Sequence, residues 1–157
     1  MIAFDLSTYQ PGDALYLWWL GHPGTPVPIG ELRMARQTKG VSLRYGEAWL
    51  QSGFPLSEDL PLLHGQVFTA GERGSAPGAL DDARPDRWGE RIIRHIDRPA
   101  RLSILEMLLF AGDDRFGALG ISTSAQQYIP RRLGPYPLLS DLIALSAAVD
   151  DRCQQTC

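Results

Sequence analysis

The apolar positions of the first 46 residues follow the patterns of β-strands. Residues 14 to 20 are nearly all apolar and rich in aromatic side chains, which predicts a strand buried on both faces. Residues 27 to 32 predict a second strand. Pro26 and Pro28 lack the amide hydrogen that a ladder needs, so they favour an edge position or the start of a strand. Residues 41 to 45 alternate apolar and polar side chains, as in a strand with one wet face. A small antiparallel meander is therefore expected.

The middle of the chain lacks a regular pattern. Residues 47 to 51 allow only a short helical turn, and residues 56 to 63 form an irregular apolar link. Residues 64 to 83 are rich in glycine and have no periodicity. We expect them to form one long loop, which in a compact domain is more often functional or mobile than idle.

The first helix is predicted to begin at Pro85. Proline suits the first position of a helix, because an amide hydrogen there would have no partner within the helix. An apolar stripe follows at Trp88, Ile92, Ile93 and Ile96. A second helix is predicted where Ser103 and Glu106 have the spacing of a capping box, with Gly112 as its C-terminal stop. Two successive helices are thus expected after the loop.

The last third of the chain predicts a strand over residues 116 to 122 and a third helix over residues 138 to 149, capped by Ser140. The expected fold class is α+β: a small antiparallel β meander or barrel-like sheet, followed by two to three helices and a short additional strand segment. We divide the chain into an N-terminal extension (1–13), a main domain (14–122), the start of a following subdomain or a C-terminal helix (123–150), and a polar tail (151–157).

Composition and charge narrow the functional classes. The chain is 44% apolar and 21% charged, as in a soluble globular protein of one compact domain, and its net charge of -3 excludes a generally basic nucleic-acid coat. It has no signal peptide and no apolar run near the roughly 18 residues of a membrane span, so we expect a cytoplasmic protein. Cys153 and Cys157 lie in the polar tail and lack the other ligands of a zinc site.

Residues suited to catalysis are missing or scattered. A protein-kinase core needs a lysine for the phosphates, a catalytic Asp and an Asn that holds metal, but Lys39 is the only lysine here and asparagine is absent. The glycines at 71, 74 and 78 precede no Gly-Lys-Ser/Thr sequence. The histidines, His22, His64 and His95, lie far apart, and the adjacent Asp pairs favour turns or caps. We predict no catalytic, metal or cofactor site, and no enzyme activity.

An unusual arginine spacing marks the first predicted helix. The residues Arg84, Arg87, Arg91, Arg94 and Arg98 recur in steps of three and four, which places them on one side of a helix. Glu90 and Arg94 have the favourable i,i+4 spacing. The simpler interpretation is a solvated, self-paired face, because charge runs usually mean only that. The alternative is a docking face for an acidic partner or for phosphates.

Several segments, in this order, resemble the N-terminal region of HipA-type serine/threonine kinases, the toxins of HipA/HipB toxin-antitoxin systems. They are Tyr45-Gly46-Glu47-Ala48-Trp49-Leu50, Pro55-Leu56-Ser57, Leu60-Pro61-Leu62, the stretch from Leu80 to Asp86, and the stretch from Gly112 to Leu119. The resemblance extends over residues 14 to 122. In the family, this region precedes a glycine-rich ATP loop, a phosphate-binding lysine, a catalytic Asp and metal-binding residues, none of which is present here.

The resemblance implies a non-catalytic interaction module that docks on a HipA-type kinase core, on a HipB-like DNA-binding antitoxin, or on both. In split relatives, a separate small protein similar to this region acts as the antitoxin. The alternative is a truncated N-terminal portion of a HipA-type kinase toxin, whose activity resides in missing C-terminal residues. No cofactor, direct nucleic-acid contact or membrane contact is expected.

The predicted partner-binding residues belong to the turn before the arginine-rich helix and to the helix itself. They are Asp82, Asp86, Arg87, Trp88, Arg91, Arg94 and Arg98. Trp88 is a candidate plug for a kinase site, but its position on the stripe of Ile92 favours a place in the core.

Overall fold

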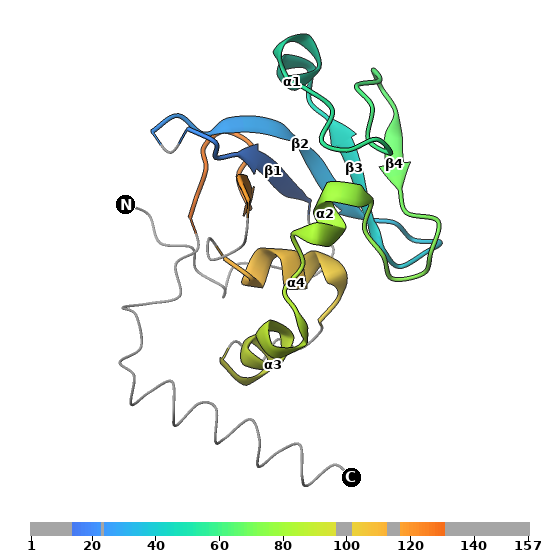
Figure 1. Cartoon of the computed structure of the whole chain (residues 1–157), viewed down its shortest axis with the longest axis vertical. Helices are drawn as coiled ribbons and strands as arrows, with labels where there is room; N and C mark the ends of the chain where they lie inside the picture. The colour runs from blue at the N-terminus through green and yellow to red at the C-terminus, as the bar shows by residue number, and fades with distance from the viewer. Residues whose placement is uncertain (1–13, 23, 97–101, 113–116, 131–157) are drawn as a thin grey trace, which may run out of the picture.

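The computed structural model describes residues 14–22, 24–96, 102–112 and 117–130 (Figure 1). Its elements, in chain order, are β1 (Leu15–Trp19), β2 (Val27–Met34), β3 (Val41–Tyr45), α1 (Glu47–Ser52), β4 (Val67–Thr69), α2 (Gly78–Asp82), α3 (Arg87–Ile96), α4 (Ile104–Phe110) and β5 (Leu119–Ser122). The predicted α+β class is confirmed, because these residues form one antiparallel sheet with helices.

The strand order of the sheet is β4-β3-β2-β1-β5, so the predicted meander of the first three strands is confirmed. The predicted additional strand is also confirmed as β5, which pairs with β1. With β4 and β5 at its two edges, the sheet is open rather than a closed barrel. The chain thus returns from its helices to complete the sheet beside the first strand.

The second strand lies at the centre of the sheet, so the predicted edge position was wrong. The alternative, that the prolines mark the start of a strand, is confirmed. Pro28 is the second residue of β2 and pairs with Trp18 of β1. Pairing with β3 begins only at Gly30, opposite Tyr45. The proline is tolerated because the beginning of β2 extends past β3 and needs fewer ladder hydrogen bonds.

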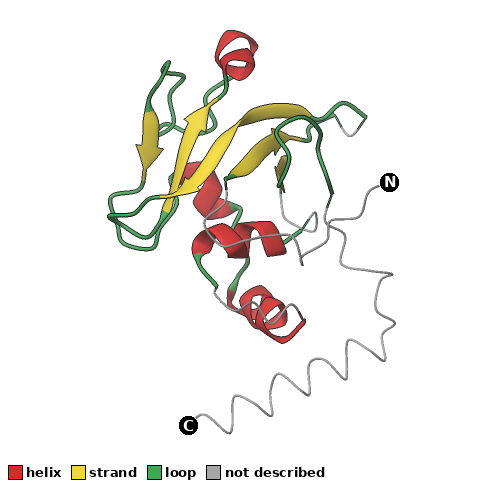
Figure 2. Ribbon diagram, turned by 180° about the vertical axis from the view of Figure 1, so that it is seen from behind, coloured by secondary structure: helices red, strands yellow, loops and turns green. Residues whose placement is uncertain are grey.

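The two faces of the sheet differ in polarity. Leu15, Leu32, Leu43 and Phe68 lie opposite one another across four strands, and all four are buried. The next cross-strand row is Tyr16, Glu31, Arg44 and Val67. Leucines of α2 and α4 join the core on the apolar face, and Figure 2 shows helices beneath the sheet. Period-two alternation thus separates a packed face from a polar one.

The α4 helix has the predicted ends. The backbone N–H of Ser103 donates to a Glu106 carboxylate oxygen at 2.9 Å, and the Ser103 side chain completes the capping box. Gly112, at φ 66°, follows the last helical turn in the left-handed conformation that glycine adopts readily. Most of the helix is buried, so this local signal positions a core element.

The prediction of one long loop over residues 64 to 83 was wrong. This segment contains β4, whose Phe68 is buried opposite Leu43, and α2, whose Leu80 is fully buried. Both elements are too short to repeat a hydrophobic period, β4 having 3 residues and α2 having 5. They become regular only through contacts with the rest of the domain.

Other sequence predictions lie outside the described residues: the N-terminal extension, the helix over 138 to 149, and the polar tail. The division of the chain into domains therefore stays a prediction. No helix in the described ranges is long and apolar enough to cross a membrane.

Replacing Tyr45 with phenylalanine should flatten the alkaline loss of stability. The buried Tyr45 hydroxyl donates to the Leu60 carbonyl at 2.8 Å and accepts from the Leu56 N–H at 3.3 Å. Burial raises the pKa of Tyr45, an effect that the Leu56 N–H opposes. Its contribution to stability is therefore complete below the unfolded-state pKa of about 10 and is lost as pH rises through the folded-state pKa.

Urea unfolding curves recorded between pH 8 and pH 11 measure the alkaline loss of stability, because this range includes the unfolded-state pKa of about 10. The variant should be less stable at pH 8 by about 1–2 kcal/mol, since a buried carbonyl and a partly buried N–H lose their partner. Its stability should then fall less steeply than that of the wild type as the pH rises. Parallel curves would contradict the assignment of the alkaline transition to Tyr45.

Candidate functional site

Five of the predicted partner-binding residues, Asp86 and four residues of α3, lie on the part of the molecule farthest from the sheet. The α3 helix lies beyond α4 (Figure 1), against which it packs. Ile93 is buried, whereas Arg87, Arg91 and Arg94 are exposed. The helix therefore has one side held by the protein and another open to solvent.

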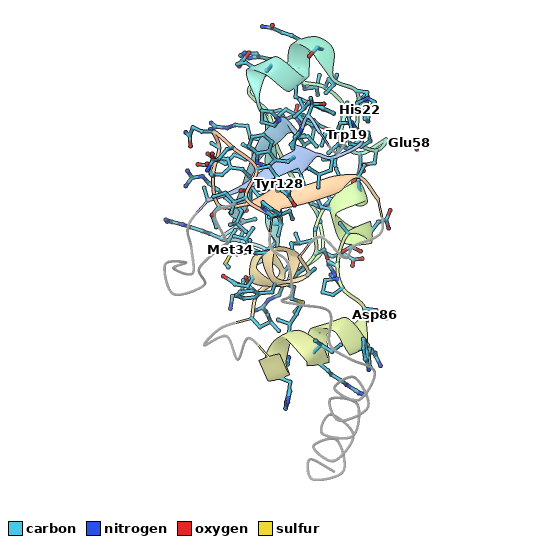
Figure 3. All side chains as sticks on the ribbon, turned by 90° about the vertical axis from the view of Figure 1, so that its left-hand side faces the viewer. Trp19, His22, Met34, Glu58, Asp86 and Tyr128 are labelled. Atoms are coloured by element: carbon cyan, nitrogen blue, oxygen red, sulfur yellow. The ribbon has the colours of Figure 1, made fainter. Side chains whose placement is uncertain are left out.

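Asp86 determines where this helix begins. Its carboxylate accepts a hydrogen bond from the Gly89 N–H at 2.7 Å, and its carbonyl accepts one from the Glu90 N–H at 2.9 Å. This is the arrangement of an N-cap, so the predicted start at Pro85 was two residues early. Figure 3 shows Asp86 at the start of α3, far from Trp19 and His22. Asp86 thus has a structural role whether or not a partner binds.

The row of five arginines is shorter in the structure than in the sequence. Arg84 precedes α3 and forms an ion pair with Asp81 of α2 at 3.1 Å, and Arg98 lies outside the described residues. The predicted pair of Arg94 with Glu90 is present at 2.7 Å. Arg87 and Arg91 form no ion pair with any described residue. Two guanidinium groups are thus left for other partners.

Trp88 is 51% exposed, so the interpretation that favoured a core position was wrong. At about 100° per residue, Trp88 lies some 140° around the helix from the buried Ile93. It lies one turn before Arg91 instead, on the open side. We call Arg87, Trp88, Arg91 and Arg94 the α3 face. The seventh predicted residue, Asp82, is exposed at the end of α2.

A hollow on the polar side of the sheet was missed by the sequence analysis. It has a volume of about 580 Å³, and its lining includes Tyr16, Glu31, Arg44 and His64. The period-two alternation of the second and third strands was the available signal. Glu31 lies 2.5 Å from Arg33 Nε and 3.7 Å from an Arg44 nitrogen.

The two glutamates around this hollow already have partners. The hydrogen bond from Arg33 lowers the pKa of Glu31, while partial burial opposes the shift. His64 likewise lies 2.8 Å from a Glu47 oxygen. Within the described ranges, no group of three or more His, Cys, Asp or Glu side chains could hold a metal ion. The α3 face, where Arg87 and Arg91 form no ion pair with a described residue, is therefore the stronger candidate for binding.

Comparison with known proteins bears on the identity of the domain. No curated protein matches the chain. The sequence profile of the HipA N-terminal domain matches residues 25–122, which extend from the turn before β2 to the end of β5. This range is more than half of the 157 residues and includes the whole α3 face. The chain therefore belongs to the HipA N-terminal domain family.

Proposed function

We propose that this chain is a non-catalytic interaction module of a toxin-antitoxin system, which docks through the α3 face on a HipA-type kinase core. The observation that carries the proposal is the exposed indole of Trp88 on an outward helix of a HipA N-terminal domain, beside two arginines that form no ion pair with a described residue. A HipB-like DNA-binding antitoxin is a second partner that the same family context supports.

Trp88 supplies the apolar part of the surface. An indole that is 51% exposed gains free energy when a partner removes it from water. Tryptophan is also enriched among the few residues that dominate binding energies, since its large rigid ring fills a pocket at low entropic cost. A hydrophobic pocket on the partner is the expected receptor.

Arg87 and Arg91 supply the charged part. Each is exposed and lacks an ion pair within the described residues, so docking breaks no salt bridge in that part of the chain. Guanidinium groups form bidentate hydrogen bonds with carboxylates, and exposed charge steers the encounter of two proteins. The matching surface is therefore an apolar pocket rimmed by Asp and Glu.

The same docking serves two arrangements of the kinase. In a longer kinase chain the α3 face contacts its own catalytic core, and in a split system it contacts a separate subunit. In the split arrangement, occupation of the kinase surface by this module neutralises the toxin. Catalysis belongs to the kinase core in both arrangements, because this chain has one lysine and no asparagine.

Two variants test the proposal by titration calorimetry with a HipA-type kinase core from the same genome. Trp88→Ala should weaken binding about tenfold or more at every salt concentration, because it removes apolar contact. Arg87→Glu with Arg91→Glu should also weaken it about tenfold or more, and more strongly at low salt. Melting temperatures should stay within about 2 °C, since all three side chains are exposed.

The double variant Arg36→Glu with Lys39→Glu is the matched control. Both of its positions are exposed, form no ion pair with a described residue, and undergo the same change in charge away from α3. It should bind the kinase core like the wild type. If both double variants lost the same affinity for the kinase core, the effect would come from net charge alone. Full affinity of the α3 variants would refute docking through this face.

A further inference from the structure

A second open surface lies between the β2–β3 turn and the beginning of α4. It is a groove of about 600 Å³ with an apolar floor and a basic rim. Its apolar residues are Met34, Leu102, Ile104 and Met107, and its cations are Arg36 and Lys39. Figure 3 shows Met34 beside α4, which also contacts β2. The groove is separate from the α3 face and shares no residue with it.

Hydrogen bonds hold the backbone of the turn that carries the rim cations. The Lys39 N–H donates to the Ala35 carbonyl at 2.8 Å, and the Gly74 N–H donates to the Thr38 carbonyl at 2.7 Å. Lys39 also has a φ of 54°, a left-handed conformation that is costly for a residue with a Cβ atom. The turn thus presents this lysine at a defined position despite local strain.

The charge of the groove is one-sided. Arg36 and Lys39 are both exposed, and neither forms an ion pair within the described part of the chain. Among the described residues that line the groove, none is acidic. The carboxylate of Glu106, on the adjacent α4, is hydrogen-bonded in the Ser103 capping box. A complementary occupant therefore combines apolar side chains with carboxylates.

Residues 138–150 of this chain have that composition. Nine of these thirteen residues are apolar, two are acidic (Asp141 and Asp150), and none is basic. Two carboxylates match the two cations of the rim. Methionines, which adapt to irregular surfaces, suit a groove that receives leucine and isoleucine side chains.

The last described residues before this segment lie beside the end of β5. The Ile129 N–H donates to Ser122 Oγ at 3.1 Å, so the chain at residue 129 lies beside the last residue of β5. β1 separates β5 from β2, which places that point about 10 Å sideways from β2 at the usual strand spacing. Residues 131–137 can span up to about 23 Å when extended. The groove is therefore within reach.

We propose that the groove binds the chain's own residues 138–150, with Asp141 and Asp150 paired to Arg36 and Lys39. The inference is independent of kinase docking, because it concerns another surface. Docking covers the apolar floor of the groove and ties the C-terminal part of the chain to the domain.

A spin label near the end of the segment tests the proposal in the full chain. Cys153 lies three residues after Asp150, and replacing Cys157 with serine leaves it as the single labelling site. Paramagnetic broadening of amide NMR signals should be strong at Gly74, Ile104 and Met107. Arg36→Glu with Lys39→Glu should abolish this broadening, and adding Asp141→Lys with Asp150→Lys should restore it by exchanging the charges.

Arg87→Glu with Arg91→Glu is the charge-matched control and should leave the broadening intact. Absence of broadening at the groove in the wild type would overturn the proposal, as would broadening that survives the Arg36 and Lys39 substitutions. A mixture of isotope-labelled protein without spin label and unlabelled protein with spin label detects binding between copies. Broadening found only in that mixture would replace the chain's own segment with that of a second molecule.

Discussion

Replacing Leu43 with alanine is expected to lower the free energy of unfolding by about 3 kcal/mol, which is the usual scale for truncating a fully buried leucine. Leu43 has no exposed surface and lies between Leu32 and Phe68 in the cross-strand row that covers the apolar face. The lost methyl groups leave a cavity that neighbouring strands cannot fill without distorting the sheet. Thermal unfolding should show a melting temperature lowered by about 10 °C.

Val67→Ala is the matched control for this substitution. Val67 lies in β4, next to Phe68, but is 54% exposed and opposite Arg44 on the other face of the sheet. Its truncation should change stability by no more than about 0.5 kcal/mol. Equal losses for the two variants would contradict the assignment of the two faces.

Gly30→Ala should also destabilise the domain, by about 2 kcal/mol or more, because of steric overlap rather than a cavity. A Cβ atom at Gly30 would collide with the Arg44 carbonyl oxygen and lie 3.0 Å from the Tyr45 Cα. These are backbone atoms of the paired strand β3, so no rotamer change relieves the contact. Chemical unfolding should have its midpoint at a lower denaturant concentration, because the substitution weakens the pairing of β2 with β3.

Gly71→Ala controls for the loss of a glycine as such. A Cβ at Gly71 would meet no atom within 4 Å, and the residue has no left-handed φ. This variant should match the wild type or gain about 0.5 kcal/mol, since alanine restricts the unfolded chain. If Gly30→Ala were equally harmless, the close approach of β2 and β3 would be refuted.

Strong local signals in the sequence were sufficient for several elements. The alternation in residues 41 to 45 predicted β3, and the spacing of Ser103 and Glu106 predicted the start of α4. The prediction of the fifth strand was also right, although its partner, β1, is about a hundred residues away. These signals work because hydrophobic period and capping hydrogen bonds act between residues close in the chain.

Weak or short signals failed for β4 and α2. Val67 to Thr69 and Gly78 to Asp82 are regular because β3 and the leucine core hold them, not because of their own pattern. The same limit applied to the arginine row, since Arg84 was counted as helical whereas it precedes α3 and pairs with Asp81. Residue spacing along a helix has meaning only once the ends of that helix are known.

Residue types and their order along the chain were sufficient for the α+β class, the family resemblance and the lack of the lysine and asparagine set of a kinase core, because none of these depends on contacts between distant segments. Packing settled the rest. It exposes Trp88, makes Asp86 the N-cap of α3, and places Lys39 at the rim of a groove formed with α4. It also leaves Arg87 and Arg91 without an ion pair to any described residue. Exposure and pairing arise from contacts between segments distant in the chain, and no local pattern contains them.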